Sequence, residues 1–230
     1  MNHILKGFGI FAMACFTDAY SMPDKQFYAA VNAGVFQADF SGNYLDKTDV
    51  IPQNMSGPAL QNNYTGGIAL GYNQKIKSDY FFGGEISAHI NGGSAVYQSG
   101  ASTSAFSDTL KLKNYFDFMF ISGIVTHSIF SPYLKLGLSY ADLSDDLVSP
   151  IGYTPIMTSF SMDKSILGFA AALGVSYSLN KRVALFSEIN FHDYGTINFQ
   201  DFQNFSADYT HSEQLTSYGL SIGAAYLFNT

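Results

Sequence analysis

Residues 217–228 read SYGLSIGAAYLF, and this stretch decides the fold. Large apolar side chains fall on alternate positions from Tyr218 to Phe228, and Ser, Gly and Ala fill most of the positions between them. A period of two residues indicates a β-strand, because successive side chains point to opposite faces of a sheet. One face of this strand is therefore oily, and the other is small and weakly polar.

The same alternation recurs along the chain. It is clear in four further segments, at 64–73, 82–91, 132–141 and 165–179. It is less regular in three others, Gln26–Phe40, Lys113–Thr126 and Val183–Asp193. Short connections are expected at 75–79, 127–131 and 180–182, and long ones at 41–62, 92–112, 142–163 and 194–216. Strict alternation of long and short connections is typical of an up-and-down transmembrane barrel.

The pattern thus predicts an all-β fold, an eight-stranded antiparallel up-and-down transmembrane β-barrel with short periplasmic turns and four long extracellular loops. Composition agrees, because only 13% of the 230 residues are charged while 16% are aromatic. A soluble sandwich is the alternative, but its water-facing side would normally carry charged residues rather than Gly, Ala and Ser. The net charge of −7 offers no basic surface for nucleic acid.

The N-terminal segment, residues 1–21, has the order of a secretory signal peptide, with one Lys, an apolar stretch and small residues after it. Cleavage is expected after Ala19 or Ser21. A lipoprotein signal with Cys15 as acceptor is the alternative, but it lacks the usual Leu three residues earlier. Residues 22–230 are then one barrel domain with both termini in the periplasm.

Four segments resemble the small outer-membrane β-barrel family that includes the OmpA transmembrane domain and the opacity and adhesion porin-like proteins. They are SPYLKLGLSY (131–140), Gly168–Tyr177, VALFSEINFHDYG (183–195), which resembles the seventh strand, and Tyr218–Phe228, which resembles the eighth. The last strand also resembles the signal presented to the barrel-assembly machinery, carried here by Tyr218, Leu220, Ile222, Tyr226 and Phe228. In this chain Asn229 and Thr230 follow the aromatic, which is usually last.

Three charges within the regular strands fall on the lumen face, namely Glu85, Lys135 and Glu188. A charge at membrane depth is costly unless it is paired, so Lys135 is expected to bind the two carboxylates. This cluster is expected to be structural, filling the lumen with polar contacts. The alternative is a gate, in which Lys135 exchanges partners and opens a narrow ion path.

His89 and His192 lie four residues beyond the two glutamates on the same face, and Asp117 is expected near His89. A metal site is not expected, because the two histidines come from opposite sides of the ring and three converging ligands are needed. No Ser–His pair faces lipid, where a lipid A-modifying barrel enzyme would need one. No catalytic residue and no cofactor are therefore expected.

The long connections are where a partner would bind. Their acidic residues are Asp142, Asp145, Asp146, Asp163, Asp201, Asp208 and Glu213. These could hold divalent cations that bridge to lipopolysaccharide or dock a basic ligand, but a solvated, mutually repelling surface is favoured. The sequence predicts a monomer in the outer membrane of a Gram-negative bacterium, with a structural and adhesin-like role through its loops. The alternatives are a narrow porin and, less favoured, a lipid A-modifying enzyme. Expected partners are outer-membrane lipids, lipopolysaccharide, the assembly machinery and a host or surface ligand.

Overall fold

The computed structural model describes residues 24–46, 58–77, 79–98, 107–126, 130–148, 159–200 and 209–229. These residues form nine strands: β1 (Lys25–Asp46), β2 (Pro58–Lys77), β3 (Tyr80–Asn91), β4 (Ala95–Gln98), β5 (Ser107–Ile124), β6 (Phe130–Val148), β7 (Ser159–Ser178), β8 (Val183–Gln200) and β9 (Tyr209–Asn229). The predicted signal peptide, with Cys15, lies outside the described residues. Within the described ranges, we find no helix that is long and apolar enough to cross a membrane.

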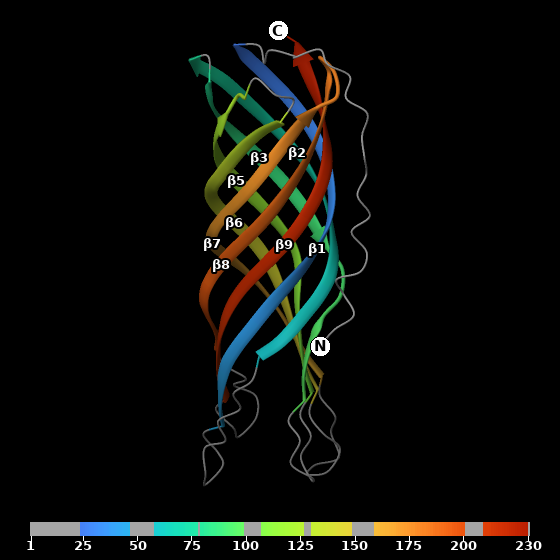
Figure 1. Ribbon diagram of the computed structural model, residues 1–230. Coiled ribbons are helices and arrows are strands. Elements are labelled where there is room, and N and C mark those ends of the chain that lie inside the picture. Colours follow the sequence, from blue (N-terminus) through green and yellow to red (C-terminus); the bar gives the residue numbers. More distant parts are fainter. Residues whose placement is uncertain are drawn as a thin grey trace, which may run out of the picture.

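The strands close into an antiparallel barrel (Figure 1). Strand β1 pairs with β2 on one side and with β9 on the other, and the β1–β9 pairing runs from Gln26↔Asn229 to Asp46↔Tyr209. The ring is completed between β3 and β5. Joining the first strand to the last closes the ring along the membrane-spanning part, as a strand-built membrane protein requires. At the loop end the ring is not continuous, because β7 before Phe169 pairs only with β6 and β8 after Asp193 pairs only with β9. The predicted eight-stranded barrel is confirmed, with its third strand divided into β3 and β4.

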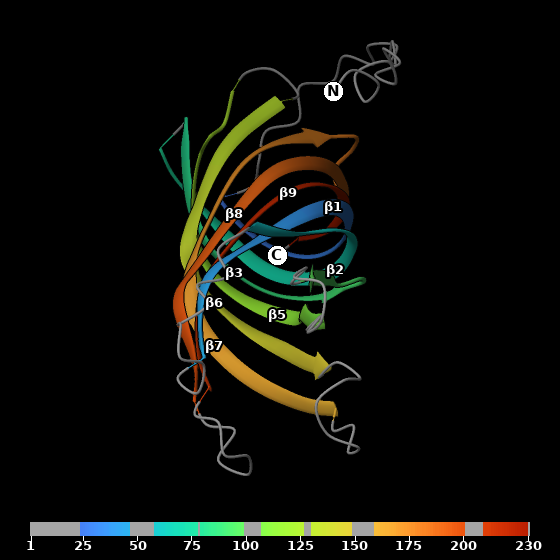
Figure 2. The same cartoon turned by 90° about the horizontal axis from the view of Figure 1, so that it is seen from below.

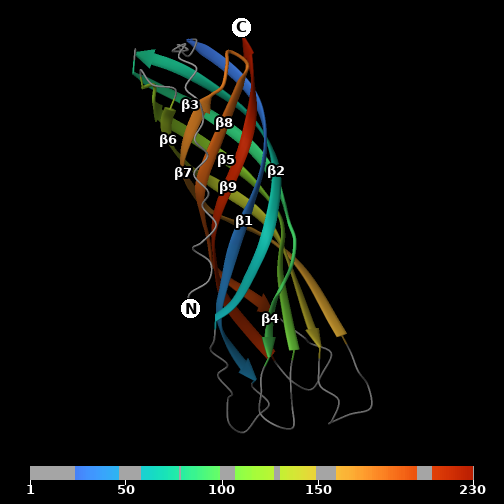
Figure 3. The ribbon, with the colours of Figure 1, turned by 45° about the vertical axis from the view of Figure 1, so that its right-hand side comes forward.

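The division of the third strand lies at residues 92–94, between β3 and β4. Gly93 there has a φ of 96°, a backbone conformation that residues other than Gly rarely adopt. Beyond it, β4 continues the pairing with β5, with Ala95 opposite Leu110. Figure 3 shows β4 at the end of the barrel remote from the C terminus.

We predict that Gly93→Ala lowers the free energy of unfolding by about 1–3 kcal/mol. The added Cβ would overlap the side chain of Asn63 as well as meet the unfavourable φ. The control is Gly92→Ala, whose Cβ would lie 4.0 Å from its nearest neighbour, the carbonyl oxygen of Tyr64. Denaturant titration of both refolded variants measures the difference. Equal losses would show that φ at Gly93 does not matter.

The barrel is apolar on the outside. Tyr64, Ile90 and Ile222 on three different strands are 78%, 72% and 66% exposed. The alternate positions point inward, and Ser139 and Ala170 there are fully buried. The predicted assignment of the oily face to the outside is therefore confirmed, and this face has the polarity that hydrocarbon solvates.

The apolar outer belt has the height of a membrane. On β1 it runs from Phe27 to Val35 and on β9 from Tyr218 to Phe228, close to the roughly 9–11 residues that a tilted strand needs to span. Seen from below, the strands cross the view as long curved ribbons rather than end-on, which shows their tilt (Figure 2).

The predicted long connections are longer than those in the structure, because the strands extend past the apolar belt. The ranges 41–62, 92–112, 142–163 and 194–216 all contain strand residues at one or both ends. Beyond the belt the polarity inverts. Leu110, Leu112 and Leu143 point inward and are buried, while Lys111 and Asp146 lie outside. This part of the barrel is built like a water-soluble one, which a search for outward apolar residues does not detect.

Candidate functional site

The interior of the barrel changes character from one end to the other. We call the end with Lys25, Asn229 and the short connections the turn end, and the opposite one the loop end. From the turn end inward there follow an open cavity, a layer of charged residues, a layer with two histidines, and a packed apolar cluster.

The charged layer is centred on Lys135 of β6. Its Nζ lies 2.7 Å from Oε1 of Glu85 on β3 and 2.6 Å from Oε1 of Glu188 on β8. Tyr28 and Tyr133 donate hydrogen bonds of 2.6 and 2.7 Å to the two carboxylates. Lys135 therefore binds both glutamates at once, as expected from their places on the third, fifth and seventh strands.

The two tyrosines were not singled out from the sequence. Both lie on inward positions, Tyr28 by the parity of β1 and Tyr133 two residues before Lys135. A buried hydroxyl needs a hydrogen-bond partner, and a buried carboxylate needs donors. An inward-facing Tyr close to an inward-facing charge is therefore the sequence pattern that indicates such a hydrogen bond.

The histidine layer corrects one expectation. Nε2 of His89 lies 3.8 Å from Oδ2 of Asp117, and Nε2 of His192 lies 3.4 Å from the same oxygen. The Tyr115 ring contacts both imidazoles, with centroid separations of 4.4 and 4.9 Å. The histidines come from opposite sides of the ring, as predicted, but the lumen is narrow enough for both to reach one carboxylate. In the described part of the chain, no group of three or more Asp, Glu, His or Cys side chains is placed to hold a metal ion.

Two Ser–His contacts lie inside the barrel and were missed, because the search was confined to the lipid face. The hydroxyl of Ser87 lies 3.0 Å from Nε2 of His89, and that of Ser217 lies 3.2 Å from Nδ1 of His192. Ser217, His192 and Asp117 therefore stand in the order of a catalytic triad. All three are buried, however, at 3%, 5% and 6% exposed. Within the lumen, these contacts satisfy buried polar atoms of the histidines and serines.

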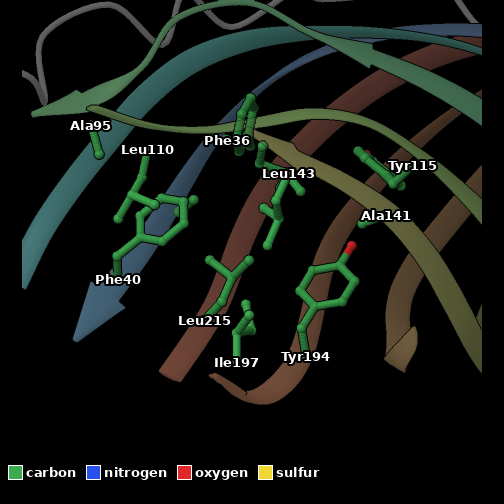
Figure 4. Packing of buried hydrophobic residues seen from close by; sticks show 12 residues of the cluster. Phe36, Phe40, Ala95, Leu110, Tyr115, Ala141, Leu143, Tyr194, Ile197 and Leu215 are labelled. Carbon is green, nitrogen blue, oxygen red and sulfur yellow. The ribbon is translucent and has the colours of Figure 1, made fainter. Parts of the chain in front are cut away.

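A packed apolar cluster fills the lumen on the loop-end side of the histidine layer, and we call it the plug. Phe40, Leu110 and Leu215 in it are fully buried (Figure 4). Its members come from six strands: Phe36, Ala38, Phe40, Ala95, Leu110, Leu112, Tyr115, Ala141, Leu143, Tyr194, Ile197 and Leu215. The loop end of the barrel therefore has a buried apolar core of its own, besides the apolar outer face.

The turn end is hollow instead. A cavity open to solvent, of about 910 Å³ when the solvent space at its mouth is included, has the Glu85–Lys135–Glu188 layer as its floor. Its walls combine apolar side chains, including Phe81, Ile121, Phe186 and Leu227, with hydroxyl side chains such as Ser131 and Ser176. The interior therefore has an entrance at one end and a plug at the other.

The acidic residues assigned to loops lie mostly on strands. Asp142, Asp145 and Asp146 belong to β6, Asp163 to β7 and Glu213 to β9. Asp201 and Asp208 lie outside the described residues. The expected repelling surface is wrong for two of them, since Lys111 binds Asp146 at 2.9 Å and Lys113 binds Asp163 at 2.7 Å.

The remaining acidic side chains also have defined places. Asp142 accepts a hydrogen bond of 2.8 Å from Ser165, and Asp145 and Glu213 are buried at 4% and 1% exposed. Hydrogen bonds from Ser161 and Lys111 hold the pKa of Asp146 below its ordinary value. Asp142, Asp146 and Asp163 are therefore hydrogen-bonded or paired on the outer surface at the loop end, whereas Asp145 and Glu213 are buried in the lumen.

Comparison with known proteins identifies related chains. A model of the outer membrane protein β-barrel domain matches residues 8–228. An uncharacterized protein of Coxiella burnetii (strain RSA 493 / Nine Mile phase I) is 25% identical over 183 residues, which cover 74% of this chain and 70% of the relative.

Two solved structures share the fold. The outer membrane protein OprG from Pseudomonas aeruginosa matches with a TM-score of 0.51 at 15% identity, over 88% of this chain and 96% of that one. The outer membrane protease OmpT from Escherichia coli matches with a TM-score of 0.51 at 11% identity, over 88% of this chain and 97% of that one. At these identities the likeness shows the fold alone.

Proposed function

This chain belongs to the family of outer-membrane β-barrel proteins, and from that premise we propose that it acts at the bacterial surface as a structural and interaction protein. Its extracellular connecting segments, 47–57, 99–106, 149–158 and 201–208, are then the parts that meet a partner. The loop end faces outward and the turn end faces the periplasm in this proposal. The topology supports this orientation, because barrels of this kind have short turns on the periplasmic side.

The observation that carries the proposal is the plug. A porin needs a continuous water path, whereas here the lumen at the loop end is filled by side chains such as Phe40, Leu110 and Leu215, none of which is exposed. Release of Lys135 from its glutamates would open only the turn-end half of the lumen. The plug therefore argues against the gated-porin alternative.

The strands beyond the belt support the same reading. The β1–β9 pairing continues to Asp46↔Tyr209, well past Val35, where the apolar belt of β1 ends. In the proposed orientation, the loop-end halves of β1 and β9 therefore lie on the outer side of the membrane.

The first test is electrical. We predict that the refolded protein in a planar lipid bilayer shows no stepwise conductance, and that Lys135→Ala does not create any, because the plug remains in place. A porin known to conduct under the same conditions serves as the positive control. Conductance steps that change in size with Lys135→Ala would establish the gated porin and overturn the plug argument.

The second test is binding by whole cells. Segments 149–158 and 201–208 are replaced by short Gly–Ser linkers, which leave β6, β7, β8 and β9 intact. We expect binding to host cells or matrix to fall to the level of cells without the protein. The matched control shortens a turn-end connection, residues 179–182, and should leave binding unchanged. Resistance of the barrel to SDS at room temperature shows that each variant has folded. Binding that survives both loop replacements would contradict the proposal.

The remaining partners follow from the surfaces. Outer-membrane lipids cover the apolar belt, and the paired charges on the outer surface at the loop end lie where lipopolysaccharide headgroups would meet the barrel. The lipid-facing residues of β9 from Tyr218 to Phe228 are proposed as the signal read by the assembly machinery. OmpT is a protease, but its likeness extends to the fold only. We propose a non-catalytic, monomeric protein, supported by the burial of Ser217.

A further inference from the structure

The turn-end cavity has features of a ligand site that the surface role does not use. Its mouth is framed by strand ends, with Gln26 at the start of β1, Asn73 near the end of β2 and Ser178 at the end of β7. Its walls are partly apolar, and its floor carries three formal charges. A cavity with an apolar lining and a few converging polar groups is the usual form of a small-molecule site.

The charge on the floor is unbalanced. Two carboxylates, Glu85 and Glu188, face one ammonium, that of Lys135, which leaves a formal net charge of −1. Within the described residues, Lys135 and Tyr133 both contact Oε1 of Glu188, and Oε2 takes neither of these bonds. A second cation next to this oxygen would balance the formal charge of the floor.

The walls also suit a cation with an apolar body. The rings of Tyr133 and Phe186 already lie 5.5 and 6.0 Å from the ammonium of Lys135, so their faces are directed at the charged layer. Aromatic faces attract ammonium groups. Phe81, Ile121 and Leu227 supply the apolar surface between the floor and the mouth.

The mouth carries unused hydrogen-bonding groups. Gln26 is 5% exposed and its Nε2 has no partner, and Oδ1 of Asn73 also has none. The two residues stand directly opposite each other on β1 and β2, and both line the cavity. Buried polar atoms without partners are costly, so such a pair indicates that water or a ligand completes their bonding.

We propose that the turn-end cavity binds a small primary alkylammonium ion, with the ammonium against Glu188 and the alkyl chain along the apolar wall. The amide pair of Gln26 and Asn73 then receives a polar group or water at the mouth. Carboxylates are excluded by the charge of the floor, and neutral alcohols gain only the contact with the wall.

The experiment compares three probes of equal chain length, n-hexylammonium, 1-hexanol and hexanoate, on the full refolded protein in detergent micelles. Binding is measured by isothermal titration calorimetry, with empty micelles as the blank. We expect hexylammonium to bind about tenfold more tightly than hexanol, as one desolvated charge pair would produce, and hexanoate not to bind. Equal affinity for hexylammonium and hexanol, or measurable binding of hexanoate, would overturn the proposal.

A variant locates the site. Glu188→Gln retains a side chain that can hydrogen-bond Lys135 and Tyr133 but brings the floor to zero net charge, so the preference for hexylammonium should disappear. Asp142→Asn removes a carboxylate at the loop end and should leave the preference for hexylammonium unchanged. Ala225→Phe adds a large side chain at the cavity wall and should abolish binding of both hexylammonium and hexanol. If hexylammonium binds Glu188→Gln or Ala225→Phe as it binds the parent protein, the cavity is not the site.

Discussion

Lys135→Met is expected to lower the free energy of unfolding by about 3–5 kcal/mol, the usual cost of leaving buried charges without their partner. Lys135 is only 6% exposed and holds two carboxylates within 2.7 Å. Met keeps most of the length of the side chain, so the loss reports the missing ammonium rather than a void. The chain has no Trp, so far-ultraviolet circular dichroism during urea titration in lipid vesicles is the suitable readout.

Two comparisons separate charge from packing in this experiment. Lys111→Met removes an ammonium from an exposed pair with Asp146, and should cost no more than about 1 kcal/mol. Adding Glu85→Gln and Glu188→Gln to Lys135→Met removes the unpaired carboxylates, and should restore much of the lost stability. A triple variant as unstable as Lys135→Met alone would show that the lysine acts through its packing.

The transmembrane part of the fold could be predicted because its two faces meet different surroundings. Outward residues such as Ile68 and Leu220 meet lipid and inward ones such as Ser139 meet a crowded lumen, so polarity alternates at the strand period. The alternation within each strand then assigned the three charged residues to the inner face, and the order of the strands gave their places around the barrel. From these followed the contact of Lys135 with both glutamates.

The loop-end half could not be predicted in the same way, for two physical reasons. Outside the membrane the outward residues meet water, so polarity inverts along the same strand, as at Leu110 and Lys111. In addition, two irregularities shift the register, at Lys113 in β5 and between Asp193 and Gly195 in β8. Along each of these strands, the inward-facing residues are even-numbered before the bulge and odd-numbered after it. The predicted strand segments Lys113–Thr126 and Val183–Asp193 begin and end at these bulges.

The histidine layer shows a different limit of sequence reasoning. Strand order correctly placed Asp117 opposite Ser87, next to His89. It also placed His192 four strands away, which suggested that the two imidazoles are far apart. Their separation depends on how far Tyr115 and the neighbouring side chains fill the lumen, and strand order contains no information about that width.

Truncating a side chain of the plug is expected to cause the second large loss of stability. The size of the loss depends on whether other groups can fill the space that the side chain leaves. Leu143→Ala should lower the free energy of unfolding by about 2–5 kcal/mol, because Leu143 is 1% exposed and the surrounding cluster cannot fill the void. Leu138→Ala on the same strand is the matched control. Leu138 is 52% exposed within the apolar belt, where acyl chains can move into the space. Leu138→Ala should therefore lower the free energy of unfolding only by the transfer free energy of the hydrocarbon groups that it removes, roughly 1–2 kcal/mol.

The comparison also tests whether the loop end is a true core. If the plug is packed like a protein interior, the cost of Leu143→Ala exceeds that of Leu138→Ala in lipid vesicles and in detergent micelles alike, because neither medium reaches the plug. Equal costs would mean that Leu143 is solvated, and the lumen would then be open at the loop end. Because the case against a conducting pore rests on this packing, the same measurement decides whether the surface role or the porin alternative is retained.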